Sequence, residues 1–441
     1  MKLNRLMPLL AAQPMIRKSP STGVALFAAI CVLAPWRGAA AHKYKYHELY
    51  SFCSQANCPD GSLPQAGLTM DQAGNLYGTT TGGGANANGT VFELVHEGPK
   101  KWKQRTLYDF CSEANCTDGA LPLSNLILDT AGNLYGTAAS RGAHNSGVAF
   151  KLDPNASGKR WKYIDLYDFC TIPAGDGGCE DGWAPSGNLT YEGADTGTPY
   201  DGNAPLYGAT RYGGDDGLGF GVVFKLNPGK KESRESVVSA LCRQANCADG
   251  AQPWGGVIMV RGALYGTTKS GGSNQPIPSG VVFRMTAKGK IAVLYTFCPN
   301  GDACLDGATP MSPLLMDPAG NLVGTTYYGG ANGAGTVFRV SGGAETVLHD
   351  FCSEANCADS KNPTAGLIMD PAGHMYGTAS GYNGAAGTVF QLDGSTEQDI
   401  YEFCCGHIVT AGVIRDASGN LFGVAYSGGN NNSGSVFELE Y

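Results

Sequence analysis

The chain has 441 residues, enough for two or three average domains or one large repeat array, and 65 of them are glycine, about twice the usual share. An apolar content of 42% excludes a disordered glycine-rich linker, so the glycines are typical of tight turns between short strands. With 30 basic and 38 acidic residues the net charge is −8, which argues against nonspecific binding to nucleic acid or anionic membranes.

The first segment, residues 1–41, has the features of an export signal. A basic stretch over residues 2–18 precedes an apolar run, Val24–Leu33, and Ala39–Ala41 offers a small-residue cleavage site. The apolar run is shorter than the about 20 residues that a transmembrane helix needs. We therefore predict a signal peptide over residues 1–41, one mature domain over residues 42–441, and a secreted or periplasmic location. Cleavage leaves 25 basic against 38 acidic residues, a net charge of −13.

The mature part repeats one unit seven times. Within the first unit we expect four short strands, at Gly67–Asp71, Asn75–Thr80, Gly89–Leu94 and Trp102–Phe110, because apolar and polar residues alternate there between turn residues. An LYG-type element ends at Gly78, Gly136, Gly208, Gly266, Gly324, Gly377 and Gly423. A VF-type element ends at Phe92, Phe150, Phe224, Phe283, Phe338, Phe390 and Phe437.

Seven units of four antiparallel strands predict an all-β fold, a seven-bladed β-propeller, with a linear β-solenoid as the alternative. The mature chain begins with a fourth-strand sequence, Tyr44–Phe52, and its last unit, Ala411–Tyr441, ends on a third strand. The N-terminal strand can therefore complete the last blade, which closes the ring and removes two exposed strand edges. A solenoid would gain nothing from beginning with a fourth strand and ending with a third one, so we predict the closed propeller.

Fourteen cysteines remain after cleavage, and their spacing follows the repeat. In an exported chain we expect a local disulfide in each pair that follows a fourth-strand sequence. These pairs are Cys53–Cys58, Cys111–Cys116, Cys170–Cys179, Cys242–Cys247, Cys298–Cys304 and Cys352–Cys357. In the last unit Cys404 and Cys405 are adjacent, which leaves a strained vicinal disulfide and two free thiols as alternatives, the former favoured. A zinc site is disfavoured because no histidine spacing accompanies the pairs.

The repeated GNLYGTT…GTVF pattern resembles the GloVer tandem-repeat family of exported bacterial proteins. Seven copies match, and they cover essentially the whole mature chain. The resemblance implies an extracellular, propeller-like repeat protein and assigns no biochemical role to it. Many members carry a C-terminal sorting anchor, but this chain ends at Tyr441 inside a strand, so we expect none here.

The loops after the second and fourth strands of each unit should share one face of the propeller, around the channel. On that face an aspartate follows the second cysteine of six units, namely Asp60, Asp118, Asp181, Asp249, Asp306 and Asp359. A ring of carboxylates is suited to Ca²⁺ or a cationic ligand. An aspartate can also begin a turn, because its carboxylate accepts hydrogen bonds from backbone N–H groups. Repetition in six units favours this structural role.

Departures from the repeat are the other candidates for ligand binding. Trp183 and Trp254 interrupt the pattern just before first strands. The third unit adds a long cysteine loop, an insertion at Glu192–Ala204, and the pair Asp215 and Asp216 in its next loop. Such insertions carry function in many repeat proteins, although tolerated surface insertions have the same appearance.

Catalytic motifs are missing from the sequence: the seven histidines show no metal-ligand spacing, and no nucleophile elbow, P-loop or HExxH is found. We predict no catalytic residue, no cofactor apart from the calcium alternative, and a monomeric propeller that binds a glycan or protein partner through its loop face. The alternatives are a carbohydrate-active enzyme, which needs two convergent carboxylates about 5 to 10 Å apart, and a structural surface protein with a blocked channel.

Overall fold

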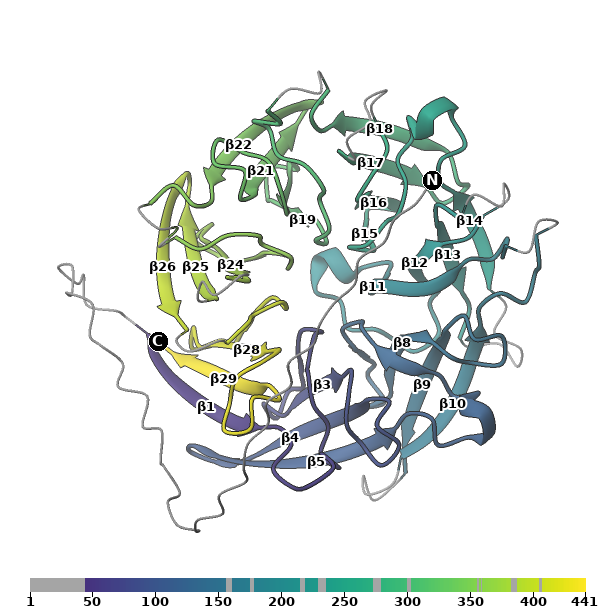
Figure 1. The fold of residues 1–441 in the computed structure, drawn as a ribbon, viewed down its shortest axis with the longest axis vertical. Coiled ribbons are helices and arrows are strands. Elements are labelled where there is room, and N and C mark those ends of the chain that lie inside the picture. Colours follow the sequence, from purple (N-terminus) through teal and green to yellow (C-terminus); the bar gives the residue numbers. More distant parts are fainter. Residues whose placement is uncertain are drawn as a thin grey trace, which may run out of the picture. The chain divides into compact units, whose positions relative to one another are not determined.

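The computed structural model describes residues 44–155, 161–174, 178–214, 219–228, 235–272, 279–299, 303–354, 357, 359–381, 387–403 and 407–441. These residues form seven antiparallel sheets arranged in a ring, so the predicted seven-bladed β-propeller is confirmed (Figure 1). The predicted signal peptide over residues 1–41, the pair Cys404 and Cys405, and Asp215 and Asp216 lie outside the described residues.

The first three blades follow the chain in order. Blade 1 comprises β2 (Thr69–Met70), β3 (Leu76–Thr80), β4 (Thr90–Gly98) and β5 (Lys101–Asp109). Blade 2 comprises β6 (Ala120–Pro122), β7 (Ile127–Leu128), β8 (Leu134–Ser140), β9 (Val148–Pro154) and β10 (Trp161–Asp168). Blade 3 comprises β11 (Trp183–Tyr191), β12 (Leu206–Tyr212), β13 (Val222–Leu226) and β14 (Ser236–Ala240). Three short 3₁₀ turns accompany them, η1 (Ala114–Cys116), η2 (Ala194–Thr196) and η3 (Ala245–Cys247).

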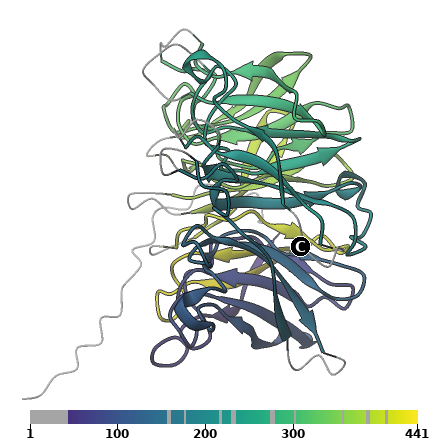
Figure 2. The same ribbon diagram turned by 90° about the vertical axis from the view of Figure 1, so that its right-hand side faces the viewer.

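Blades 4 to 6 repeat the same order of strands. Blade 4 comprises β15 (Val257–Val260), β16 (Ala263–Thr267), β17 (Val281–Thr286) and β18 (Ile291–Thr296). Blade 5 comprises β19 (Leu315–Met316), β20 (Leu322–Thr326), β21 (Thr336–Ser341) and β22 (Ala344–Asp350). Blade 6 comprises β23 (Ile368–Met369), β24 (Met375–Ala379), β25 (Thr388–Asp393) and β26 (Thr396–Glu402). The fourth strand of each blade lies at the periphery (Figure 1), and the strands run across the thickness of the ring (Figure 2).

Blade 7 is built from both ends of the described chain. It contains β27 (Ile414–Arg415), β28 (Leu421–Ala425), β29 (Ser435–Glu440) and, as its outer strand, β1 (Lys45–Ser51). The antiparallel ladder between β1 and β29 runs from the Lys45–Glu440 pair to the Ser51–Ser435 pair. His47 Nε2 lies 2.8 Å from Glu440 Oε2. The predicted closure of the ring by the N-terminal strand is confirmed.

The LYG-type positions must be glycine because a side chain there would have no room, and not because the backbone needs a special conformation. Each of them pairs across the ladder with the VF-type phenylalanine of the same blade, and all seven of these rings are fully buried. A Cβ at Gly324 would lie 2.7 Å from Phe338 Cζ and 3.0 Å from Leu314 Cδ2. Because interiors are close-packed, the ring occupies the volume that any side chain would need. The two repeated elements are therefore one packing unit.

The hydrophobic core consists of seven clusters, each shared by neighbouring blades. The cluster between blades 1 and 2, for example, joins Tyr77 and Val91 to Leu134, Phe150 and Leu152. The second-strand tyrosines, such as Tyr77, therefore pack between blades, as core residues do.

A recurring glycine–proline contact fixes where each blade enters the centre of the ring. Gly89, with φ at +97°, precedes β4, and a Cβ there would lie 2.8 Å from Cδ of Pro122 in the next blade. The same contact recurs at Gly147–Pro185, Gly221–Pro253, Gly280–Pro310, Gly335–Pro363 and Gly434–Pro64. In five of the six cases the residue after the proline lines the central cavity described below.

The insertion of blade 3 at Glu192–Ala204 is anchored to blade 2. Tyr200, which is 1% exposed, packs edge-on against Tyr135, and its carbonyl accepts a hydrogen bond from Thr130 N–H at 2.9 Å. This part of the insertion contributes to the core.

Candidate functional site

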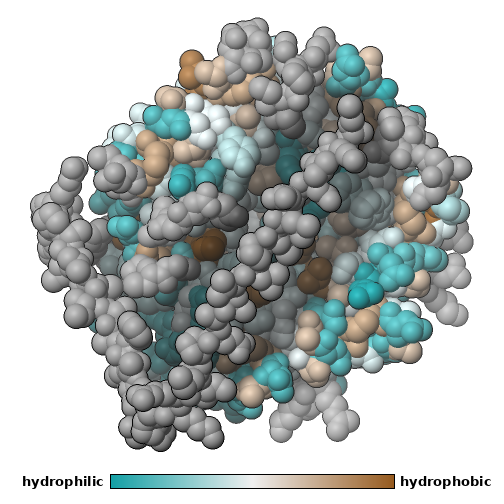
Figure 3. Space-filling model, viewed as in Figure 1, coloured by the Kyte–Doolittle hydropathy of each residue, from teal (hydrophilic) through white to brown (hydrophobic). Residues whose placement is uncertain are grey.

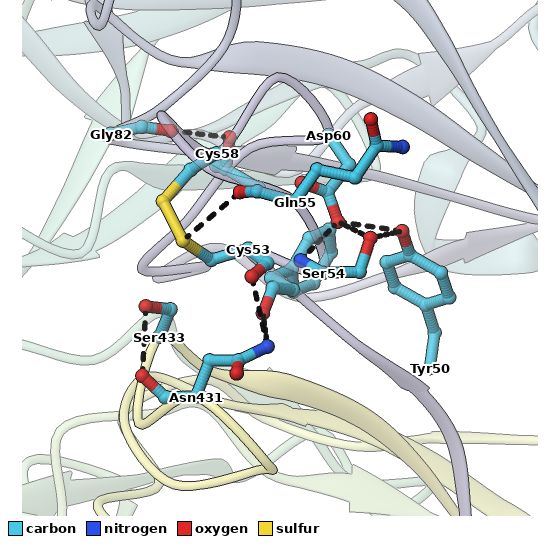
Figure 4. The surroundings of a disulfide bond; sticks show 11 residues. Tyr50, Cys53, Ser54, Gln55, Cys58, Asp60, Gly82, Asn431 and Ser433 are labelled. Carbon is cyan, nitrogen blue, oxygen red and sulfur yellow. Dashed lines mark hydrogen bonds between the residues drawn. A yellow bond between two sulfur atoms is a disulfide. The ribbon is translucent and has the colours of Figure 1, made fainter.

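The six predicted disulfides are all formed, at Cys53–Cys58, Cys111–Cys116, Cys170–Cys179, Cys242–Cys247, Cys298–Cys304 and Cys352–Cys357. In the first of these loops, Tyr50 O–H donates to Asp60 Oδ2 at 2.6 Å and Ser54 Oγ donates to it at 3.0 Å (Figure 4). Asn431 of blade 7 reaches the same loop, and its Nδ2 donates to the Cys53 carbonyl at 2.8 Å. Each disulfide therefore holds a loop that is also tied to its surroundings.

The aspartates of these loops, Asp60, Asp118, Asp181, Asp249, Asp306 and Asp359, point into the loops. Asp181 is 0% exposed and accepts the Thr171 N–H at 2.8 Å and the Ile172 N–H at 3.2 Å. Asp249 accepts two backbone N–H groups in the same way. These hydrogen bonds to backbone N–H groups are the ones expected of an aspartate that stabilises a turn. The ligand-binding role stays a prediction.

The calcium alternative needs several convergent oxygen donors. Among the residues that the structure describes, no three His, Cys, Asp or Glu side chains are placed to hold a metal ion. Each loop aspartate described here instead accepts hydrogen bonds within its own loop, and the calcium alternative stays a prediction.

The cysteine loops and the glycine-rich loops after the second strands lie together, as predicted. Gly84 N–H donates to the Cys58 carbonyl at 2.8 Å, and Gly142 N–H donates to the Cys116 carbonyl at 3.0 Å. Blades further along the chain repeat the contact at Gly214–Cys179, Gly272–Cys247 and Gly330–Cys304. These loops define the face of the propeller that we call the cysteine-loop face.

A central cavity of about 380 Å³ lies where the seven blades meet. Every blade contributes to its wall through the residues just before or within its first strand, and glycine and alanine make up much of the wall. The contributing segments are 65–67, 123–125, 187–188, 254–255, 311–313, 364–368 and 410–414. Hydrophobic side chains surround the centre of the ring in Figure 3.

One position of the repeat supplies the variable part of this wall. The residue after the blade-entry proline, or after Val409 in blade 7, lines the cavity as Gln65, Leu123, Trp254, Met311, Thr364 and Thr410. Sequence reasoning selected only Trp254 from this set. A comparison of the seven units position by position would have found the others, because this residue varies while it lies between a proline and a small residue in six units.

Two cations lie against the ring of Trp254. The guanidinium carbon of Arg211 is 3.9 Å from the centroid of the indole, and Lys269 Nζ is 4.3 Å from it. Arg211 and Trp254 both line the cavity. Arg211 and Lys269 were not among the predicted site residues, although both stand three positions after an LYG-type glycine.

Trp183, the other predicted tryptophan, lies at the start of β11, where it pairs with Tyr212 of β12. The two rings stack with centroids 4.3 Å apart, and Trp183 is 38% exposed. Trp183 does not line the central cavity, so the structure does not bring the two predicted tryptophans together in one pocket.

The three functional hypotheses make different demands on the cavity. A ligand-binding protein should have an open pocket with polar or aromatic groups, and the described wall contains Trp254, Arg211, Asn125 and Asn188. An enzyme of the predicted kind should have two carboxylates there, and the described wall contains neither Asp nor Glu. A purely structural propeller should have a blocked channel, which a volume of about 380 Å³ does not match.

Three blades carry a half-buried glutamate at one repeat position, close to the cysteine-loop aspartate that follows the preceding blade. Burial, followed by the charge of Asp181, raises the pKa of Glu235 to about 8. Burial, followed by the charges of Asp306 and Asp350, raises the pKa of Glu345 to about 7. The pKa of Glu397 is raised as well, first by burial and then by Asp399.

These shifts predict that alkaline pH destabilises the fold. The folded state keeps the Glu235 proton up to about pH 8, whereas the unfolded state releases it near pH 4.5. The free energy of unfolding therefore falls as the pH rises between these two values. Glu235→Gln should leave the free energy of unfolding nearly unchanged at about pH 5 and raise it by about 2 kcal/mol at about pH 9. Urea unfolding at both pH values measures this, with the exposed Asp195→Asn as the charge control. An equal gain at both values would contradict the prediction.

The chain matches the model of one known protein family. A family model described as a Gloeobacter/Verrucomicrobia repeat matches residues 38–201 and 191–390. The chain belongs to this family. The resemblance inferred from the GNLYGTT…GTVF pattern is thereby confirmed.

No curated protein matches this Gloeobacter/Verrucomicrobia repeat protein. Among solved structures it is similar to the aldose sugar dehydrogenase of Escherichia coli, with 13% identity, a TM-score of 0.42, and 72% of this chain and 96% of the other covered. A chain of the mitotic checkpoint complex shares 10% identity, with a TM-score of 0.49 and 94% and 98% covered. The sialidase of Trypanosoma rangeli, in complex with sialic acid, shares 10% identity, with a TM-score of 0.46 and 91% and 59% covered. At these identities and scores the likenesses assign no activity.

The described part of this repeat protein contains no helix of the length and apolar character needed to span a bilayer.

Proposed function

We propose that this chain is an exported binding protein that holds a small ligand in the central cavity of its propeller. The observation that carries the proposal is the cavity itself, about 380 Å³ in volume, with described residues of all seven blades in its wall. Ligand pockets of proteins span about 300 to 1,000 Å³ and combine apolar walls with a few placed polar groups. The cavity has both properties.

The construction of the wall supports a binding role. The blade-entry prolines and the disulfide-bonded cysteine loops hold the wall segments in place, so little ordering is needed when a ligand enters. Of the two partner classes predicted from the sequence, this volume favours a small molecule such as a glycan unit over a protein surface. Six disulfides in one chain are typical of an oxidising compartment, which supports a secreted or periplasmic location.

Filling the cavity tests the proposal. Thr410 lines the cavity and its Oγ1 has no hydrogen-bond partner, so Thr410→Trp fills space without removing a side-chain bond. Thermal-shift measurements on the mature protein against a panel of mono- and disaccharides and organic acids should identify compounds that stabilise the wild type. Each of them should lose at least about 90% of its effect in Thr410→Trp, because mass action links stabilisation to affinity.

The control is Thr396→Trp, which adds the same side chain at an exposed position on the outer strand β26. It should respond to every compound as the wild type does. A panel with no stabilising compound, or one whose compounds stabilise Thr410→Trp fully, would refute binding in the cavity.

A further inference from the structure

Arg211 and Lys269 occupy the same position of the repeat in neighbouring blades. Each is the third residue after the glycine of its LYG-type element. The other five units have Thr81, Ala139, Tyr327, Ser380 and Tyr426 at this position. Two adjacent blades of an acidic protein therefore carry a cation where the remaining blades carry a neutral residue.

Trp254 is the second departure from the repeat at this place. It follows the entry proline of blade 4, and both cations lie against its ring, at 3.9 Å for Arg211 and 4.3 Å for Lys269. The ring fixes the position of both charges, since a cation is attracted to the face of an indole. The three residues form one cluster, which we call the blade 3–4 cation cluster.

The cation cluster has no acidic partner among the described residues. Two arginines elsewhere in the described chain do have an acidic partner: Arg105 lies 3.4 Å from Glu93, and Arg339 lies 3.7 Å from Asp317. Burial lowers the pKa of Arg211, and burial followed by the charge of Arg211 lowers the pKa of Lys269. Two like charges are thus held together without an acidic partner from the described residues.

Hydrogen-bond donors of the cluster are also unused. Arg211 Nε and Trp254 Nε1 are buried and have no hydrogen-bond partner. A buried donor without an acceptor costs about 1 to 3 kcal/mol. An acceptor with negative charge would satisfy the donors and offset the repulsion between the cations.

We propose that the ligand of the central cavity carries an oxyanion, a carboxylate or a phosphate, which binds at the blade 3–4 cation cluster. The inference rests on the proposed function and adds the chemical class of the ligand. Arg211 lines the cavity, and its planar guanidinium matches the two oxygens of a carboxylate or phosphate. Lys269 supplies a second positive charge at the same ring, and the indole N–H of Trp254 is a further donor.

Three probes with one ring test the charge requirement, namely glucose, glucuronate and glucose 6-phosphate. Calorimetric titration of the mature protein should give at least about tenfold tighter binding for a charged probe than for glucose, which corresponds to about 1.4 kcal/mol. A preference for glucuronate or for glucose 6-phosphate distinguishes a carboxylate ligand from a phosphate ligand. Arg211→Gln should lower the affinity for the charged probe at least about tenfold and thereby remove the preference for that probe over glucose.

The matched control is Lys225→Gln, which removes a cation 5.9 Å from the Tyr207 ring, away from the cavity wall. It should bind the charged probe like the wild type, and Trp254→Phe, which keeps a ring but removes the N–H, should bind it more weakly. Equal binding of glucose and the charged probes that Thr410→Trp abolishes would overturn the charge requirement and leave cavity binding intact. If neither Arg211→Gln nor Thr410→Trp weakens binding of the charged probe, the charge requirement and binding in the cavity are both overturned. The same holds if no probe and no compound of the thermal-shift panel binds.

Discussion

A chain that begins at Phe52, and so lacks β1, should lose about 5 to 10 kcal/mol of stability and form oligomers. Blade 7 would keep only three strands, and the edge of β29 would be free to pair with another chain. The contacts of Tyr46 with Tyr401 and Phe437 would also be lost. Thermal unfolding followed by circular dichroism and size-exclusion chromatography measure the two effects.

The control for this truncation is a chain that begins at Tyr44, which keeps all of β1. It should unfold at the temperature of the mature protein and elute as a single species. If the chain that begins at Phe52 does the same, the closure strand has no energetic role and the explanation given for the phase shift of the repeat is wrong.

Gly324→Ala should destabilise the protein by about 2 to 3 kcal/mol, although it adds only one methyl group to a residue with ordinary backbone conformation. The methyl would lie 2.7 Å from Phe338 Cζ, inside the ring's van der Waals radius. In the background of Phe338→Leu, which lacks that atom, the same substitution should cost at least about 1 kcal/mol less. Denaturant unfolding of the four proteins of this double-mutant cycle gives the coupling energy.

A cycle without coupling would show that the glycine is required for another reason, such as the flexibility of β20. The equivalent cycle at Gly136 and Phe150 in blade 2 is an independent repetition, because a Cβ there would lie 2.8 Å from the ring. Agreement between the two blades would establish the glycine–phenylalanine pair as the unit that the repeat preserves.

Much of the architecture could be predicted because it depends on repeated, local signals. The four strands of the first unit correspond to β2, β3, β4 and β5, and the phase of the two terminal strands was sufficient to predict the ring. The cysteine pairs were predictable because each joins residues of one short loop. Strand lengths were less predictable: β2, β19, β23 and β27 have two residues each, and blade 2 has the additional β6.

The cation cluster could not be predicted in the same way, because its members come from two blades and only Arg211 lies in a strand. Trp254 was singled out for interrupting the repeat, but a single aromatic residue does not indicate what lies against it. Arg211 and Lys269 are ordinary surface residues in the sequence. Their contact depends on the angle between blades 3 and 4, which only the three-dimensional structure provides.

The pairing of β1 with β29 makes closure of the ring a late step of folding. β1 stays unpaired until β29, which lies nearly 400 residues later in the chain, has been made. Each disulfide joins cysteines only 5 to 9 positions apart and can therefore form before the ring closes. The noncovalent pairing of the two terminal strands then completes the seventh blade.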